Sequence, residues 1–238
     1  MSEGRFKAVI FDVGGVVMSS PFIAIAQYEK EQGLPDQYIN CSIVSRGSQG
    51  AWQKFERGEL ELLPFYEAFS RDLSDTVNGN VCCSPKLFGA MMRTAKVYDP
   101  HVREAIRRIR AAGRHKIIAL TNNYSSTQAT PIPASELAFL GWDDGATPQE
   151  LRQLFDDFCD SSTLGTRKPE PKFYLMACER NGIQPHEAVF LDDIGINLKA
   201  AKILGMETIH VPIGGTLAAV KELGKKIDLD LTGDVAKL

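Results

Sequence analysis

The sequence predicts an α/β fold: a Rossmann-like, doubly wound parallel sheet with an inserted helical cap. Short apolar stretches with little polar alternation recur along the chain, which is typical of strands buried on both faces. Amphipathic helical patterns separate most of these stretches, and this order favours a parallel sheet. One long block, residues 19–96, has helical periodicity without a convincing strand, and it is too long for a loop between two strands.

The expected strands are short and apolar. The first runs into Asp12, and the second is the stretch Lys-Ile-Ile-Ala-Leu. The four expected strands are Lys7–Phe11, Lys116–Leu120, Ala188–Leu191 and Glu207–Val211. Because parallel strands run in one direction, the residues that follow them should meet at one edge of the sheet.

The helices between the strands carry recognisable end signals. Val102–Ala112 has apolar residues on one face and stops at Gly113. The residues Thr147-Pro-Gln-Glu150 form a capping box, which predicts a helix that continues through Phe158. Two further helices, each followed by a glycine, are Pro171–Asn181 and Asn197–Leu204.

The inserted block predicts a helical cap, residues 19–96, over the carboxyl edge of a core made of residues 1–18 and 97–238. Its expected helices are Phe22–Glu31, Ala51–Arg57, Leu62–Leu73 and Pro85–Arg93. Its aromatic side chains either pack the cap's own core or form a wall for an apolar phosphate such as a lipid monoester. They are Phe22, Tyr28, Trp52, Phe55, Phe65, Tyr66 and Phe69.

The net charge limits the kinds of partner that we expect, and the cysteine content indicates the cellular compartment. The net charge of −3 gives no basic field for nucleic acid, and no apolar run is long enough to span a membrane. The N-terminus lacks the apolar stretch of a signal peptide. Five cysteines without a C-x-x-C motif indicate a reducing, cytoplasmic compartment. The final Ala236-Lys-Leu238 is similar to the peroxisomal Ser-Lys-Leu address, so peroxisomal import is the alternative.

Polar residues follow the expected strands, or precede the helix that follows one, in an order that suits phosphoryl transfer. Taken alone, each of these residues has an ordinary structural explanation, since aspartates often cap helices and Asp-Asp pairs often lie in turns or on solvent-exposed helix faces. The chain has two other such pairs, Asp143-Asp144 before a glycine and Asp156-Asp157 in the expected helix. The candidate site residues are Asp12, Thr121, Asn122, Lys168, Asp192, Asp193 and Asn197.

The chemistry follows from the residue types. A carboxylate such as Asp12 is able to attack phosphorus and form an aspartyl-phosphate. Asp192 and Asp193 would repel Asp12 unless a cation lies among them, and oxygen ligands select Mg²⁺. Thr121 supplies a hydroxyl donor and Lys168 a positive charge for the phosphoryl oxygens.

Together these motifs resemble the haloacid dehalogenase-like hydrolases, and the resemblance spans about residues 5–225. It is closest to the phosphatase domain of soluble epoxide hydrolases and to similar domains fused to acyl-CoA dehydrogenases. The stretches that carry it are Leu-Thr-Asn-Asn, Lys-Pro-Glu-Pro and Phe-Leu-Asp-Asp-Ile-Gly-Ile-Asn-Leu-Lys.

The resemblance implies a role for each motif residue. Mg²⁺ would be held by Asp12, the backbone carbonyl of Gly14 and Asp193, with Asp192 and Asn197 in support. The nucleophile would be Asp12, assisted by Thr121 and Lys168. The phosphate or substrate would contact Val13, Gly14, Thr121, Asn122 and Lys168. The expected ligand is a small-molecule phosphate, and the expected assembly is a monomer or homodimer.

Gly14 departs from the family pattern, in which most phosphatases carry an aspartate that acts as general acid and base. Three readings compete. The first is a phosphatase for good leaving groups, or one with an acid from the cap or from solvent. The second is a slow or inactive homologue with a phosphate-binding or regulatory role. The third, a 2-haloacid dehalogenase, fits least well because the Asp-Asp pair indicates a metal.

Overall fold

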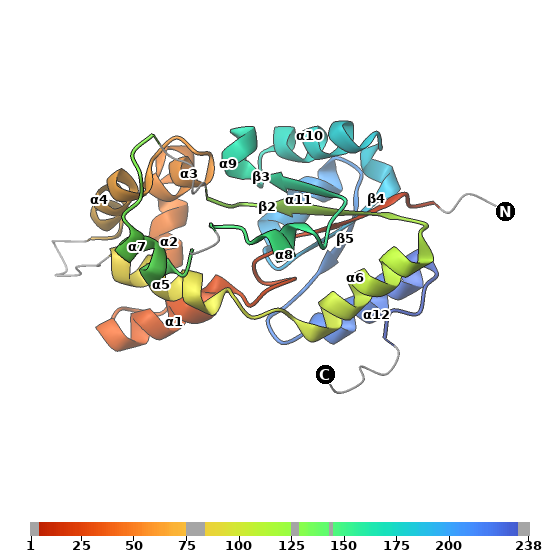
Figure 1. Cartoon of the computed structure of the whole chain (residues 1–238), viewed down its shortest axis with the longest axis horizontal. Coiled ribbons are helices and arrows are strands. Elements are labelled where there is room, and N and C mark those ends of the chain that lie inside the picture. The colour runs from red at the N-terminus through yellow and green to blue at the C-terminus, as the bar shows by residue number, and fades with distance from the viewer. Residues whose placement is uncertain (1–4, 75–83, 125–128, 143–144, 233–238) are drawn as a thin grey trace.

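The computed structural model describes residues 5–74, 84–124, 129–142 and 145–232, and it contains one parallel sheet (Figure 1). The strand order is β3-β2-β1-β4-β5, so the strand that carries Asp12 lies in the centre. The strands are β1 (Ala8–Phe11), β2 (Lys116–Thr121), β3 (Asp157–Asp160), β4 (Ala188–Asp192) and β5 (Glu207–His210). The predicted α/β fold with a parallel sheet is confirmed.

Helices cover both faces of the sheet, as the alternation of side chains along β1 requires. Val9 and Phe11 pack against α6 (Pro100–Ala112) and α12 (Thr216–Ile227). Ala8 and Ile10 point to the opposite face, towards α10 (Pro171–Asn181) and α11 (Gly195–Ile203). Figure 1 shows the resulting three layers of helices, sheet and helices. The strands are therefore buried on both sides, which explains their uninterrupted apolar sequence.

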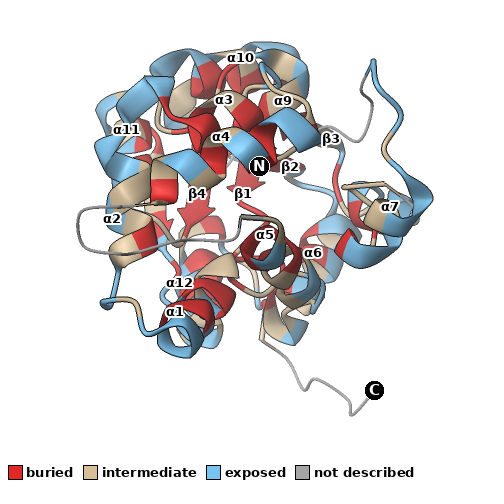
Figure 2. Ribbon diagram, turned by 90° about the vertical axis from the view of Figure 1, so that its left-hand side faces the viewer, coloured by how far each residue is buried: buried red, intermediate tan, exposed pale blue. Residues whose placement is uncertain are grey.

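A second group of helices lies beside the sheet and has its own apolar core (Figure 2). The four predicted helices are present within two residues of their expected ends, and α2 is an addition that the sequence analysis missed. The helices between β1 and α6 are α1 (Pro21–Gln32), α2 (Tyr38–Ser45), the short η1 (Gly47–Gln49), α3 (Ala51–Glu56), α4 (Leu62–Leu73) and α5 (Ser84–Thr94).

The aromatic side chains of this group pack mainly against one another. The rings of Phe55 and Phe65 stack with centroids 4.1 Å apart, and Trp52 packs on Phe69 at 5.3 Å. Of the aromatic residues that the sequence analysis named in this block, Phe22 is partly buried and the others are buried in this helical core. Helix α7 (Ala134–Leu140), which follows β2, also packs into it. The cap boundaries at 19 and 96 remain a prediction.

The expected helix from Thr147 through Phe158 is wrong. The structure has only a short α8 (Gln149–Arg152), and the chain then extends into β3, which pairs with β2. Leu151 lies in α8 and Phe155 in the irregular segment that follows it, and both side chains fill the sheet core. Pairing with β2 instead satisfies the backbone groups along that strand, which would otherwise be unpaired.

The carboxylates of Asp156 and Asp157 stabilise the β3 edge of the sheet and do not lie on a solvent-exposed helix face. Asp156 accepts from the backbone N–H of Ile117, and Asp157 accepts from Arg180 and Asn181. Thr147 does not cap a helix, because its hydroxyl accepts from the amide of Asn123.

The remaining short helices are α9 (Ser161–Leu164) and η2 (Pro185–Glu187). Within the described ranges, no helix has the length and apolarity needed to cross a membrane. Asp143-Asp144 and Ala236–Leu238, which the sequence analysis singled out, lie outside the described residues, as do two of the five cysteines, Cys82 and Cys83.

Candidate active site

The ends of β2, β1 and β4, which are neighbours in the sheet, bring the predicted site residues together. Asp12 follows β1, Thr121 ends β2 and Asp192 ends β4. All three are buried, with exposures of 6%, 5% and 0%. The parallel sheet thus places residues that are more than 60 positions apart in sequence at one edge.

Lys168 joins two of these carboxylates. Its Nζ lies 2.8 Å from Oδ1 of Asp12 and 2.7 Å from Oδ2 of Asp192, and its side chain is only 1% exposed. Asn197 donates its amide to both oxygens of Asp192, at 3.1 and 3.2 Å. A buried charge requires such partners, so Asp192 and Asn197 hold the lysine ammonium next to Asp12.

The carboxylates of the site perturb one another. Burial raises the pKa of Asp12 well above its usual value, Lys168 opposes this rise, and Asp192 and Asp193 add to it. Burial lowers the pKa of Lys168, but Asp12 and Asp192 more than reverse that effect. Burial and Asp192 raise the pKa of Asp193 to about 6. One lysine therefore does not neutralise the three carboxylates, and a further cation is favoured.

The donor atoms suit a hard divalent cation. One carboxylate oxygen from each of Asp12, Asp192 and Asp193 lies within 4.8 Å of the others. Ser20 donates to Oδ2 of Asp193 at 3.2 Å, whereas Oδ1 is buried and accepts no hydrogen bond from the described residues. A buried carboxylate oxygen without a donor is costly, and a metal ion would satisfy it.

Gly15 lies so close to Asp193 that a side chain would disturb the carboxylate. Its φ is +85°, and a Cβ built on it would lie 2.1 Å from Oδ2 of Asp193. Gly113 is a matched control, because its φ is +63° and a Cβ there would meet nothing within 4 Å.

We expect Gly15→Ala to weaken Mg²⁺ binding at least tenfold, because outer contacts of metal ligands are worth about 10–100-fold in affinity. Gly113→Ala should cost only the strain of a left-handed alanine, about 1–2 kcal/mol of stability. Isothermal titration with Mg²⁺ and thermal unfolding of both variants measure this difference. Equal metal affinity in the two variants would contradict it.

The other predicted residues line the same edge with specific contacts. Both polar atoms of the Asn122 side chain bond to the backbone of Lys168, at 2.8 and 3.1 Å. The N–H of Val13 donates to Oδ1 of Asp12 at 2.7 Å. Thr121 donates only a long bond, 3.4 Å, to the Asn122 carbonyl. Their contacts with phosphate, and the carbonyl of Gly14 as a metal ligand, stay predictions.

Two further residues, which are not among the candidates from the sequence, contact Asp193. Ser20 contacts Asp193 and also caps α1, and a serine before Pro21 is a signal that could have marked it. His210, at the end of β5, lies with its Nε2 3.2 Å from the backbone oxygen of Asp193.

A comparison with family models matches residues 6–205 to the haloacid dehalogenase-like hydrolases. The chain belongs to this family. The resemblance noted in the sequence is thereby confirmed.

Among curated proteins, this haloacid dehalogenase-like hydrolase is similar to mouse acyl-CoA dehydrogenase family member 10, with 34% identity over 93% of the chain. It is 28% identical to pig bifunctional epoxide hydrolase 2 over 94% of the chain. The chain spans only 19% and 39% of the lengths of these two relatives. It is also 31% identical to a phosphoglycolate phosphatase from Nitrosospira multiformis, over 87% of the chain and 84% of that protein.

A solved structure of the same fold is the HAD family enzyme BT-2542 from Bacteroides thetaiotaomicron, in complex with magnesium and inorganic phosphate. The TM-score is 0.56 at 19% identity, over 86% of this chain and 93% of that one. At this identity the likeness concerns the fold.

Proposed function

We propose that this chain is a Mg²⁺-dependent phosphomonoesterase that acts through an aspartyl-phosphate on Asp12. The observation that carries the proposal is the buried arrangement at the strand ends. Asp12 is paired with Lys168 at 2.8 Å and lies in a group of three carboxylates whose oxygens approach within 4.8 Å. A nucleophilic carboxylate, a fixed positive charge and a cation site are the parts that phosphoryl transfer requires.

In the first step, a carboxylate oxygen of Asp12 attacks phosphorus and the bond from phosphorus to the ester oxygen breaks. Water then attacks the aspartyl-phosphate, which releases inorganic phosphate and restores the carboxylate. Lys168 stays beside the oxygens of Asp12, where it stabilises the charge of the phosphoryl group. A bound Mg²⁺, held by Asp12 and Asp193 with the Gly14 carbonyl, would neutralise the negative phosphate next to the carboxylates.

The leaving oxygen must take a proton, and Gly14 has no side chain that donates one. In this proposal the proton comes from water, which serves good leaving groups but slows alkyl esters. The enzyme should therefore prefer aryl and acyl phosphates to alkyl phosphates.

The substrate that we propose is a small phosphate ester rather than a lipid-like one. The aromatic side chains of the helical layer are largely buried against one another, so they are occupied by the packing of that layer. The similarity to a phosphoglycolate phosphatase across most of both chains supports a small substrate.

Phosphate release by the purified protein tests this function. With Mg²⁺, p-nitrophenyl phosphate and acyl phosphates should turn over, and alkyl phosphates should react roughly 10²–10⁴-fold more slowly, the range that general acid catalysis spans. EDTA should stop turnover and added Mg²⁺ should restore it. Equal rates across leaving groups would contradict the assigned role of Gly14.

Gly14 also favours one alternative, a catalytically weak or inactive homologue that binds phosphates or regulates a partner. No release of phosphate from any ester, with Mg²⁺ and inorganic phosphate still bound in titration, would select it. The dehalogenase reading is not favoured, because the acidic cluster around Asp193 suits a cation.

A further inference from the structure

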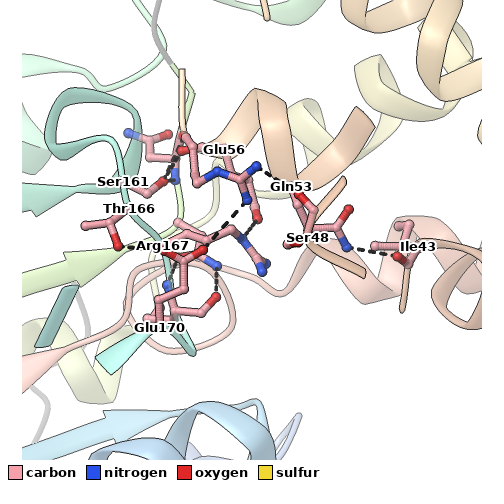
Figure 3. A network of polar contacts seen from close by, with 12 residues as sticks. Ile43, Ser48, Gln53, Glu56, Ser161, Thr166, Arg167 and Glu170 are labelled. Atoms are coloured by element: carbon pink, nitrogen blue, oxygen red, sulfur yellow. Dashed lines mark hydrogen bonds and ion pairs between the residues drawn. The ribbon is translucent and has the colours of Figure 1, made fainter. Parts of the chain in front are cut away.

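A largely buried ion pair connects the helical layer to the loop that carries Lys168 (Figure 3). Glu56 is the last residue of α3, and its Oε2 lies 2.5 Å from Nε of Arg167. The side chains are only 5% and 17% exposed. Arg167 immediately precedes Lys168 in the chain, so the pair lies one peptide bond from the lysine that contacts Asp12.

The contact is reinforced by the backbone at the end of α3. The carbonyl of Glu56, which has no partner within the helix, accepts from Oγ of Ser161 at 2.5 Å. Gly58, with φ +72°, lets the chain pass so close to the loop that a Cβ would lie 2.7 Å from the Ser162 carbonyl. Nearby, Arg57 lies 3.7 Å from Glu170. The end of α3 is therefore closely fitted to residues 161–170, which comprise α9 and the loop that carries Lys168.

The loop is held from the sheet side as well. Asn122 binds the N–H and the carbonyl of Lys168, and Thr166 donates to Glu170 at 2.7 Å. The backbone at Lys168 is thus fixed by the end of β2, and the residue before it is fixed by α3. Removing one partner of a largely buried charge pair destabilises the folded protein, because the other charge is left without a partner.

We propose that Glu56 and Arg167 are positioning residues, which hold the Lys168 ammonium in place beside Asp12 only while α3 is docked on the loop. The importance of Lys168 rests on the function proposed above. The pair makes the geometry of the active site depend on the placement of the helical layer. Displacement of α3 would release Arg167, loosen the loop and lower the order of the lysine.

Three variants test this inference: Glu56→Gln, Arg167→Gln and the variant that carries both substitutions. Each single change should speed hydrogen–deuterium exchange over residues 161–170 roughly tenfold or more, because a charged hydrogen bond is lost. The Lys168 amide is the most informative position, since it donates to Asn122. The double variant should exchange no faster than the faster single variant, because both changes remove the same interaction.

The same variants are assayed with p-nitrophenyl phosphate and Mg²⁺. We expect kcat to fall about 10–100-fold with little change in KM, because a displaced catalytic group costs about that much. Glu136→Gln is the matched control. Glu136 accepts from Tyr66 within the helical layer, away from the loop, so exchange over 161–170 and kcat should stay as in the wild type.

The exchange measurement decides the inference even if the wild-type protein releases no phosphate, a result that would overturn the proposed function instead. If the Lys168 amide exchanges at the wild-type rate in both single variants, the pair does not hold the loop. Faster exchange with an unchanged kcat would also overturn the inference, because the lysine would then be positioned without the pair. Thermal unfolding shows whether each variant is folded. If one single variant does not fold, the exchange rate and kcat of the other single variant test the inference.

Discussion

Replacing Asp12 with asparagine should lower phosphate release on the order of 10³-fold or more, because the amide is no longer a nucleophile. The phosphorylated protein that we expect after mixing the wild type with acyl phosphate should also disappear. Intact-mass spectrometry after acid quenching detects that species, and a phosphate assay measures turnover.

A matched control for this variant is Asp160→Asn. Asp160 is a buried aspartate, 4% exposed, at the end of β3, but its carboxylate caps α9 by accepting from Thr163. The control should lose some stability and keep its turnover. Full activity of the Asp12→Asn variant would contradict the assignment of Asp12 as the nucleophile.

The second large effect is expected from Gly14→Asp, which restores the acid found in most phosphatases of the family. The backbone at Gly14 has no left-handed φ, and a Cβ there would lie 3.5 Å from Cδ of Pro21, an ordinary contact. The Cβ of an aspartate therefore fits at this position. Because general acid catalysis contributes about 10²–10⁴-fold, alkyl phosphates should turn over much faster, while p-nitrophenyl phosphate should gain little.

The control for that variant is Gly14→Asn, which has a similar size but no acidic proton. The leaving-group dependence of kcat/KM distinguishes the two. If asparagine and aspartate raise the rate on alkyl phosphates equally, the gain does not come from proton transfer.

The gathering of the candidate residues at one edge of the sheet was largely predictable, because most of them follow strands. Asp12 and Asp192 come directly after apolar stretches, and a parallel sheet brings such positions together whatever their separation in sequence. The family resemblance implies that Lys168 assists Asp12, but the contact of its ammonium with both carboxylates depends on the path of a loop, which the sequence pattern does not encode.

Other features depend on contacts that a local pattern does not encode. Strand β3 is an edge strand. Because two of its four residues are the aspartates Asp157 and Asp160, it lacks the apolar run by which the other strands were recognised. Its formation depends on pairing with β2 rather than on its own propensity. The pair of Glu56 and Arg167 joins residues 111 positions apart, and either residue alone looks like an ordinary surface charge.

The packing of α7 limits how segments of this chain can be exchanged with those of a relative. Leu140 and Trp142, which come after β2 in the chain, are buried in the same apolar core as Trp52 and Phe88. A chimera that exchanged only residues 19–96 would leave these two side chains facing foreign neighbours, with a cavity or a clash in place of the native fit. A workable graft would have to transfer two stretches of the gene together, the long block and the region of α7.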